Sequence, residues 1–174
     1  MAKEVRINIQ YYDSPCGRLF LASFADKLCL CDWRDNPFAE RNKRRLKRYL
    51  KASFKTETTP VLEETKRQLD DFFAGKRKAF DIQIRLAGTD FQQQVWNALL
   101  SIPYGATKSY KEIAQCIGKP KAVRAVAGAI GANGISILIP CHRVIGSNRS
   151  LTGYAGGLVA KRMLLGMETT EHKC

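Results

Sequence analysis

The chain has 174 residues, of which 45% are hydrophobic and 26% charged, as in an ordinary folded globular protein. It has 29 Lys and Arg against 16 Asp and Glu, and this net charge of +13 points to a polyanionic partner such as nucleic acid, although a merely basic surface also fits. No apolar run approaches the roughly 18 residues of a membrane span, so we expect no membrane association.

The first half of the chain predicts a small antiparallel sheet. Residues 5–11 alternate between apolar and polar side chains, as in a half-buried strand. Residues 19–24 and 28–33 predict two further strands of a meander, and residues 80–86 a last strand. The composition changes at Ala87-Gly88, where we place the domain boundary.

Two helices are expected within this half. Asn36-Pro37 has the cap and first-turn proline of a helix start, and Thr59-Pro60 opens a second helix that ends near Gly75. The first helix has a weak apolar stripe of Phe38, Leu46, Tyr49 and Leu50. It also carries seven cations, Arg41, Lys43, Arg44, Arg45, Lys47, Arg48 and Lys51. Such a run is usually a solvated helix face, but it could also steer DNA at long range.

The second half predicts mainly helices. Residues 89–92 (TDFQ) and 109–112 (SYKE) are capping boxes that open helices. The second of these helices stops at Gly118, and another is expected from Pro120 to about Gly131. This pair has the helix lengths and the intervening glycine-containing turn of a helix-turn-helix.

The second helix of this pair has an unusual surface. Lys121, Arg124 and Gly128 are spaced by three and four residues, which places them near one another on one face. Glycine costs a helix roughly 0.5–1 kcal/mol relative to alanine. Small residues beside cations are tolerated where a nucleic-acid backbone must approach, although close helix–helix packing would also explain them.

Residues 135–141 predict a buried strand that Pro140 ends, and Cys141 and His142 follow at once. The thiol is a candidate nucleophile, or equally an inert buried cysteine. Neighbours on an extended strand point to opposite faces, so direct contact between the two side chains is not assumed, although the turn after Pro140 would allow a contact through water. Glu168, at the end of a helix over residues 158–168, is a candidate to orient His142.

The cysteine pattern favours reduced thiols. The six cysteines are too irregularly spaced for a disulfide scaffold, so we expect a cytosolic-type compartment, or the nucleus in a eukaryote. We expect the tail with His172 and Cys174 to be disordered.

With two histidines the chain offers no zinc-ligand set, and residues 153–157 lack phosphate-loop spacing. We therefore predict neither a metal nor a cofactor. A basic protein with a helix-turn-helix and a reactive thiol suggests damaged nucleic acid as the substrate. If Cys141 took an alkyl group from it, no cofactor would accept the group, which would stay on the sulfur as a thioether.

Pro140-Cys141-His142-Arg143-Val144 resembles the active-site signature of the O6-alkylguanine-DNA alkyltransferases, or methylated-DNA–protein-cysteine methyltransferases. The resemblance runs from Phe91 to Glu168. It passes through residues 102–105, 109–110, 119–126, 133 and 153–157, with Lys161. The first half resembles the family only in its layout.

The resemblance implies an α+β fold. Residues 1–88 would form a ribonuclease-H-like domain with a small antiparallel sheet, and residues 89–174 a helical, winged-helix-like domain containing the helix-turn-helix. The implied function is DNA repair by direct reversal, in which a monomer binds double-stranded DNA and flips out the damaged base. An alkyl group would move irreversibly from O6 of guanine, and from O4 of thymine, to Cys141.

The resemblance also implies roles for individual residues. The catalytic set would be Cys141 as acceptor, His142 as base through a water, Glu168 as its orienter and Tyr110 as a donor to the base. The DNA-binding set would be Arg124, which enters the base stack, with Tyr110, Lys121, Ala122 and Gly128. The base pocket would comprise Val144, Tyr154, Ala155 and Asn133, the last also holding the helix-turn-helix against the active-site segment. Some relatives have serine at the position of Ala155.

Three other functions remain open on the residues alone. Related proteins that bind lesions without repair lack the cysteine, whereas this chain has Cys141. A helix-turn-helix regulator would have base-reading side chains where Ala, Val and Gly dominate residues 122–131. A thiol hydrolase with a Cys-His pair would leave the +13 charge without a purpose.

Overall fold

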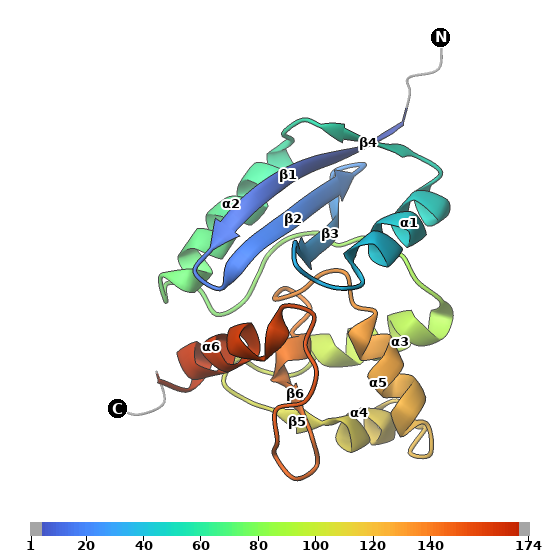
Figure 1. Ribbon diagram of the computed structural model, residues 1–174, viewed down its shortest axis with the longest axis vertical. Helices are drawn as coiled ribbons and strands as arrows, with labels where there is room; N and C mark the ends of the chain where they lie inside the picture. Colours follow the sequence, from blue (N-terminus) through green and yellow to red (C-terminus); the bar gives the residue numbers. More distant parts are fainter. Residues whose placement is uncertain (1–4, 171–174) are drawn as a thin grey trace. The chain divides into compact units, whose positions relative to one another are not determined.

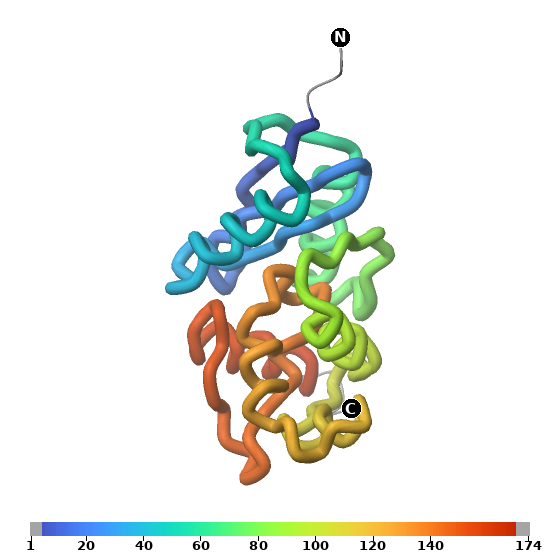
Figure 2. The backbone as a smooth tube through the Cα atoms, turned by 90° about the vertical axis from the view of Figure 1, so that its right-hand side faces the viewer, coloured from blue at the N-terminus to red at the C-terminus, as the bar shows by residue number. Residues whose placement is uncertain are grey.

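The computed structural model describes residues 5–170, so the expectation for His172 and Cys174 lies outside the described residues. The chain forms two compact units, Met1–Ala87 and Gly88–Cys174, and passes once between them along the green part of the trace (Figure 2). Both units contain helices and strands (Figure 1), which confirms the α+β class. Within residues 5–170, no helix combines the length and the apolar character needed to span a bilayer.

The first unit contains the predicted meander. β1 (Arg6–Ser14), β2 (Gly17–Phe24) and β3 (Lys27–Trp33) pair antiparallel in chain order. A fourth strand, β4 (Ser53–Thr56), adds parallel to β1 and gives the order β3-β2-β1-β4. β4 is not predictable from an alternating pattern, because three of its four residues are exposed.

The expected strand at residues 80–86 is not formed. The segment makes one isolated bridge, between Ile84 and Leu28. Two backbone bonds flank this bridge: Leu28 N donates to Gln83 O at 2.9 Å, and Arg85 N donates to Leu28 O at 2.8 Å. The segment therefore closes over the edge of β3 without extending the sheet.

Two helices cover opposite faces of this sheet. α1 (Ala39–Leu50) packs Leu46 and Leu50 into a cluster with Phe20 and Ala22 of β2. α2 (Pro60–Phe73) lies on the other face, since the hydroxyl of its N-cap residue Thr59 is 2.9 Å from that of Ser23, the next residue of β2. The predicted Thr59-Pro60 start is confirmed.

The predicted start of α1 is wrong. The helix begins at Ala39, after a turn in which Asn36 Oδ1 accepts from Phe38 N at 3.0 Å and Asn36 Nδ2 donates to Asp32 Oδ1 at 2.9 Å. Asn36 therefore closes a turn instead of capping the helix. The apolar stripe is also narrower than expected, because Phe38 is 53% and Tyr49 43% exposed.

The second unit contains α3 (Asp90–Leu100), α4 (Tyr110–Cys116), α5 (Val123–Gly131) and α6 (Gly157–Thr170). Two short parallel strands, β5 (Lys108–Ser109) and β6 (Val144–Ile145), were not predicted. The structure confirms both capping boxes, at Thr89 and Ser109. α4 and α5 form the helix-turn-helix, and Trp96 Nε1 of α3 donates to Ala129 O of α5 at 2.8 Å.

α5 is shorter than predicted. Residues 119–122 form a turn in which Ala122 N donates to Lys119 O at 2.9 Å, and the helix begins only at Val123. Lys121 and Ala122 therefore precede the helix, and the expected three-residue face reduces to Arg124 and Gly128 on α5 itself. Both of these residues are exposed.

Candidate active site

The segment before Cys141 is buried, as expected, but it is not a strand. Ile139 N donates to Ile135 O at 3.1 Å and Leu138 N to Ser136 O at 2.8 Å, so the backbone bonds are local. Ile137 has a φ of 72°, which is rare for a β-branched residue. A short apolar run does not distinguish a strand from a buried turn, and this is why the prediction failed.

Asn133 holds this turn in place. Its side chain is 2% exposed and lies just after α5. Its Nδ2 donates to Ile139 O at 3.1 Å, and its Oδ1 accepts from Ile135 N at 2.9 Å. The end of the second helix of the helix-turn-helix is thus bonded to the segment that leads into Cys141.

Cys141, His142 and Arg143 form a single 3₁₀ turn and are all buried. The alternation expected of an extended strand therefore does not apply to Cys141 and His142. The Cys141 side chain is 5% exposed, so an electrophile can reach its sulfur only by entering a closed site.

His142 and Arg143 both bind Glu168, at the end of α6. His142 Nε2 is 2.8 Å from Glu168 Oε1. Arg143 Nε donates to Glu168 Oε2 at 2.9 Å, and Arg143 Nη2 donates to Oε1 at 2.8 Å. Burial alone would raise the pKa of Glu168, but these hydrogen bonds hold it at about 2. The carboxylate is therefore ionised at neutral pH.

The imidazole of His142 is neutral and suited to act as a base. Burial is the largest influence on the pKa of His142 and lowers it, against the opposing effect of Glu168. Because a carboxylate only accepts hydrogen bonds, Nε2 carries the proton and Nδ1 the lone pair. Nδ1 is buried and bonds to no side chain or backbone group within residues 5–170.

Lys161 bonds to two segments that follow Cys141 in the chain. Its side chain is fully buried in α6. Its Nζ donates to Val144 O at 2.6 Å, Thr152 O at 2.9 Å and Gly153 O at 3.3 Å. Burial is the main influence on the pKa of Lys161 and lowers it, whereas the charge of a Cys141 thiolate raises it. A charged Lys161 correspondingly stabilises that thiolate.

Tyr110 and three of the predicted pocket residues lie in or beside this region. Tyr110, the first residue of α4, donates its hydroxyl to Thr152 O at 3.3 Å, the carbonyl that Lys161 also binds. Tyr154 and Ala155 follow in the same loop and are half-buried. Val144 is fully buried.

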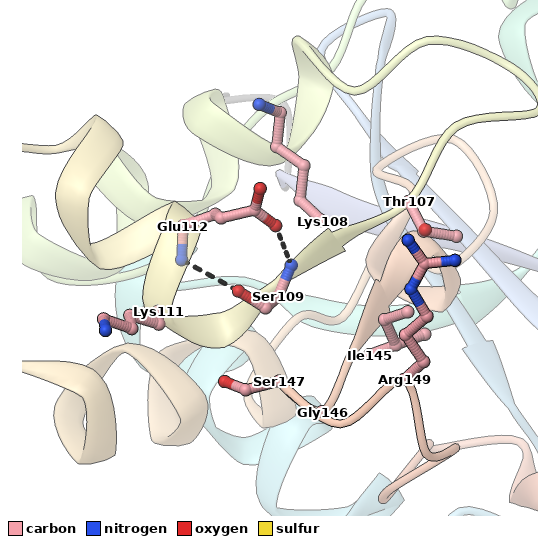
Figure 3. Close-up of a pocket in the computed structure, with 9 residues that line it drawn as sticks. All are labelled: Thr107, Lys108, Ser109, Lys111, Glu112, Ile145, Gly146, Ser147 and Arg149. Atoms are coloured by element: carbon pink, nitrogen blue, oxygen red, sulfur yellow. Dashed lines mark hydrogen bonds between the residues drawn. The ribbon is translucent and has the colours of Figure 1, made fainter.

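A basic hollow of about 400 Å³ is lined by residues of β5, the start of α4, and the end of β6 with the loop that follows it (Figure 3). Lys108, Lys111 and Arg149 contribute its cations. Its one carboxylate, Glu112, is engaged with Ser109 in the two reciprocal bonds of the capping box, drawn as dashed lines in Figure 3. The hollow therefore presents net positive charge. Within residues 5–170, no three metal-ligating side chains cluster.

Arg143 and Lys161 are site residues for which no role was predicted from the sequence. A signal for Lys161 exists, since it precedes Glu168 by seven residues, two helical turns on one face. Arg143 is harder to assign, because its partner Glu168 lies 25 residues further along the chain. Arg124 and Gly128 are exposed on α5, whereas His142 and Glu168 are buried.

Comparisons with known proteins agree with this arrangement. Residues 7–86 match the ribonuclease-like domain of 6-O-methylguanine DNA methyltransferase and residues 90–170 its DNA binding domain. A Haemophilus influenzae methylated-DNA–protein-cysteine methyltransferase is 42% identical over 159 residues, covering 91% of this chain and 84% of that protein. The constitutive Bacillus subtilis enzyme of the same name is 41% identical over 174 residues, covering 95% and 99%.

Among solved structures, Mycobacterium tuberculosis OGT in complex with DNA superimposes with a TM-score of 0.79 at 41% identity. The match covers 95% of this chain and 94% of that one. The likeness spans both units and includes the segment that carries the buried thiol. The chain therefore belongs to the methylated-DNA–protein-cysteine methyltransferase family.

Proposed function

We propose that this protein repairs O6-alkylguanine in double-stranded DNA by moving the alkyl group onto Cys141. The observation that carries the proposal is the buried turn that places Cys141 beside a neutral His142, itself bonded to an ionised Glu168. The family to which the chain belongs supports the same chemistry.

The transfer forms one bond and breaks one. The Cys141 thiolate attacks the alkyl carbon, a sulfur–carbon bond forms, and the electron pair of the carbon–O6 bond returns to guanine. A free thiol has a pKa of about 8.5 and needs a base at neutral pH. His142 Nδ1 takes the proton through a bridging water, and Glu168 stabilises the resulting imidazolium. The product thioether does not hydrolyse, so each molecule acts once.

The leaving guanine gains negative charge, and Tyr110 is the donor assigned to it. The hydroxyl of Tyr110 is held near the 152–154 loop by Thr152. That loop continues into Tyr154 and Ala155, which with Val144 would line the base pocket. The same geometry would serve O4-alkylthymine, with Ala155 unable to supply the hydroxyl contact of serine.

A base in duplex DNA must leave the stack before it can reach a buried thiol. Arg124, exposed on α5, would fill the space that the nucleotide leaves, while Lys121, Ala122 and Gly128 would lie against the backbone. The basic hollow lined by Lys108, Lys111 and Arg149 has the charge to hold a phosphate of the rotated strand. A monomer suffices for all these steps, in the cytoplasm or, in a eukaryote, the nucleus.

A stoichiometric assay tests the proposal. The protein is incubated with duplex DNA containing O6-methylguanine, and both partners are analysed by mass spectrometry. We expect one methyl group per molecule on Cys141 and unmodified guanine in the DNA. The matched controls are Cys141→Ser and Cys116→Ser, because Cys116 is an exposed thiol elsewhere in the same unit.

Cys116→Ser should react like the wild type, and Cys141→Ser should bind the lesion without repairing it. Methyl transfer to another cysteine, or repeated turnover on excess DNA, would contradict the proposal. Lesion binding by the wild type without transfer would instead identify a protein that recognises damage without repairing it.

A further inference from the structure

The positive charge of the first unit is concentrated in α1. Residues 1–87 contain 19 Lys and Arg against 12 Asp and Glu. Residues 39–51 alone hold seven of these cations and one acid, Glu40. The remainder of the unit is almost balanced, with 12 cations and 11 acids. The unit without the active-site cysteine thus has one strongly basic element.

The fold directs this charge to the solvent. α1 buries Asn42, Leu46 and Leu50, and this leaves Arg41, Arg44 and Arg48 exposed. These arginines are spaced by three and four residues, so they follow one face of the helix over about 10 Å. Two lysines flank this face, with Lys43 Nζ 4.5 Å from the ring centre of Phe20 and Lys47 Nζ 5.1 Å from that of Phe54.

The three arginines are not neutralised. No carboxylate lies within ion-pair distance of Arg41, Arg44 or Arg48 in the part of the chain that the structure describes. Elsewhere in the same unit, Arg18 and Arg67 pair with acids at 2.7 Å and 3.1 Å. The α1 guanidinium groups instead have aromatic neighbours: Arg41 lies 4.4 Å from the ring centre of Phe38, and Arg48 lies 5.9 Å from that of Tyr49.

Helix stability does not account for this pattern. Cations near the helix C-terminus, such as Lys47 and Arg48, interact favourably with the helix dipole, but Arg41 in the first turn opposes it. Like charges three and four residues apart also repel. A bound anion would relieve both the repulsion among the cations and the unfavourable interaction of Arg41 with the helix dipole.

We infer that α1 is a second DNA-binding surface, which contacts the sugar–phosphate backbone of double-stranded DNA without reading its sequence. This inference rests on the proposed function, which already requires the protein to act on duplex DNA. Guanidinium groups bind phosphate with two parallel hydrogen bonds, and a flanking aromatic ring leaves the edge of the guanidinium open to do so.

An anionic membrane fits α1 less well than DNA does. A helix that lies in a membrane interface inserts its apolar face among the lipids. Leu46 and Leu50 of α1 are buried in the protein core, and the exposed rings of Phe38 and Tyr49 lie beside Arg41 and Arg48 instead of forming an apolar face.

The test compares two triple variants with equal loss of charge. Arg41→Gln/Arg44→Gln/Arg48→Gln removes the proposed contacts, and Lys27→Gln/Lys55→Gln/Lys76→Gln removes three exposed cations elsewhere in the same unit. Binding to a long, undamaged duplex is measured over a range of salt concentrations. We expect the slope of log K against log salt to become shallower by about 2–3 in the arginine variant and to change by less than one in the lysine variant. Thermal unfolding verifies that both variants are folded.

Equal slopes for the two variants would overturn the inference. So would an arginine variant that keeps its DNA slope but loses binding to vesicles of phosphatidylglycerol and phosphatidylcholine. Methyl transfer to Cys141 with a saturating lesion duplex should be unchanged in both variants. A wild-type protein that binds DNA without methyl transfer would refute the proposed function. The comparison of the arginine and lysine variants would still test whether α1 binds DNA.

Discussion

His142 Nε2 lies 2.8 Å from Glu168 Oε1, and neither side chain is exposed to solvent. The fold thereby keeps a neutral imidazole against an ionised carboxylate, with Arg143 on the carboxylate's remaining lone pairs. Both groups bind protons more readily in the unfolded chain, so the pair links stability to pH.

We predict two stages of acid destabilisation. The pKa of His142 is lowered from 6.5, so its contribution is present above pH 6.5 and is lost as the pH falls below that value. The pKa of Glu168 falls from 4.5 to about 2, so its contribution is present above pH 4.5 and is lost as the pH approaches 2. A shift of that size corresponds to about 3 kcal/mol. Urea unfolding at a series of pH values measures both stages.

Glu168→Gln should abolish the lower stage and destabilise the protein by about 3–5 kcal/mol at pH 7, because Arg143 loses its buried counter-charge. Glu57→Gln is the control, since Glu57 is exposed, and it should keep both stages. A Glu168→Gln profile parallel to that of the wild type between pH 4.5 and 2 would refute the assignment.

The sequence was most informative where structure is determined locally. The capping boxes at Thr89 and Ser109, and the Thr59-Pro60 start, each depend on side chains within three residues of the helix end. Such contacts are encoded in the spacing itself. The helix-turn-helix followed from the same signals.

The conformation of the buried segment that holds Cys141 was not predictable from the sequence. It depends on partners distant in sequence and on an unusual backbone conformation. The turn before Cys141 is held by Asn133 and has a left-handed Ile137. Arg143 and Lys161 meet their partners across 25 and 17 residues. An apolar run before Pro140 carries none of this information.

Lys161→Met should slow methyl transfer while the lesion is still bound. The change leaves the carbonyls of Val144, Thr152 and Gly153 without their shared donor, and a displacement of about 1 Å in a site can cost on the order of a hundredfold in rate. The loss of a positive charge also disfavours the Cys141 thiolate. Single-turnover transfer and iodoacetamide labelling of Cys141 should therefore both slow at neutral pH.

Arg162→Met is the matched control for Lys161, because Arg162 is the next residue of α6 and is exposed. It should leave both rates close to those of the wild type. Equal effects of the two changes would show that Lys161 acts only through the general charge of the protein.

Asn133→Ala should destabilise the protein by about 1–3 kcal/mol, because it leaves Ile135 N buried without a partner and removes one of the two hydrogen bonds to Ile139 O, which keeps the bond from Cys141 N at 2.7 Å. It should also reduce transfer in the molecules that remain folded, since the turn before Cys141 loses its anchor. Chemical denaturation and single-turnover kinetics measure the two effects. Asn148→Ala, in an exposed loop, should change neither, and an unaltered Asn133→Ala protein would contradict the role of this side chain.

Gly128→Ala separates the effect of this glycine on the stability of α5 from its effect on DNA binding. A Cβ at Gly128 would meet no atom within 4 Å, so alanine should stabilise the free protein by about 0.5–1 kcal/mol. If a DNA backbone lies against this face, the same methyl group should weaken binding to duplex DNA. Gly166→Ala in α6 is the control, because its Cβ would also meet no atom within 4 Å; it should raise stability without changing DNA affinity. Thermal unfolding and duplex titration together decide, and equal DNA affinities for the two variants would place the DNA elsewhere on the second unit.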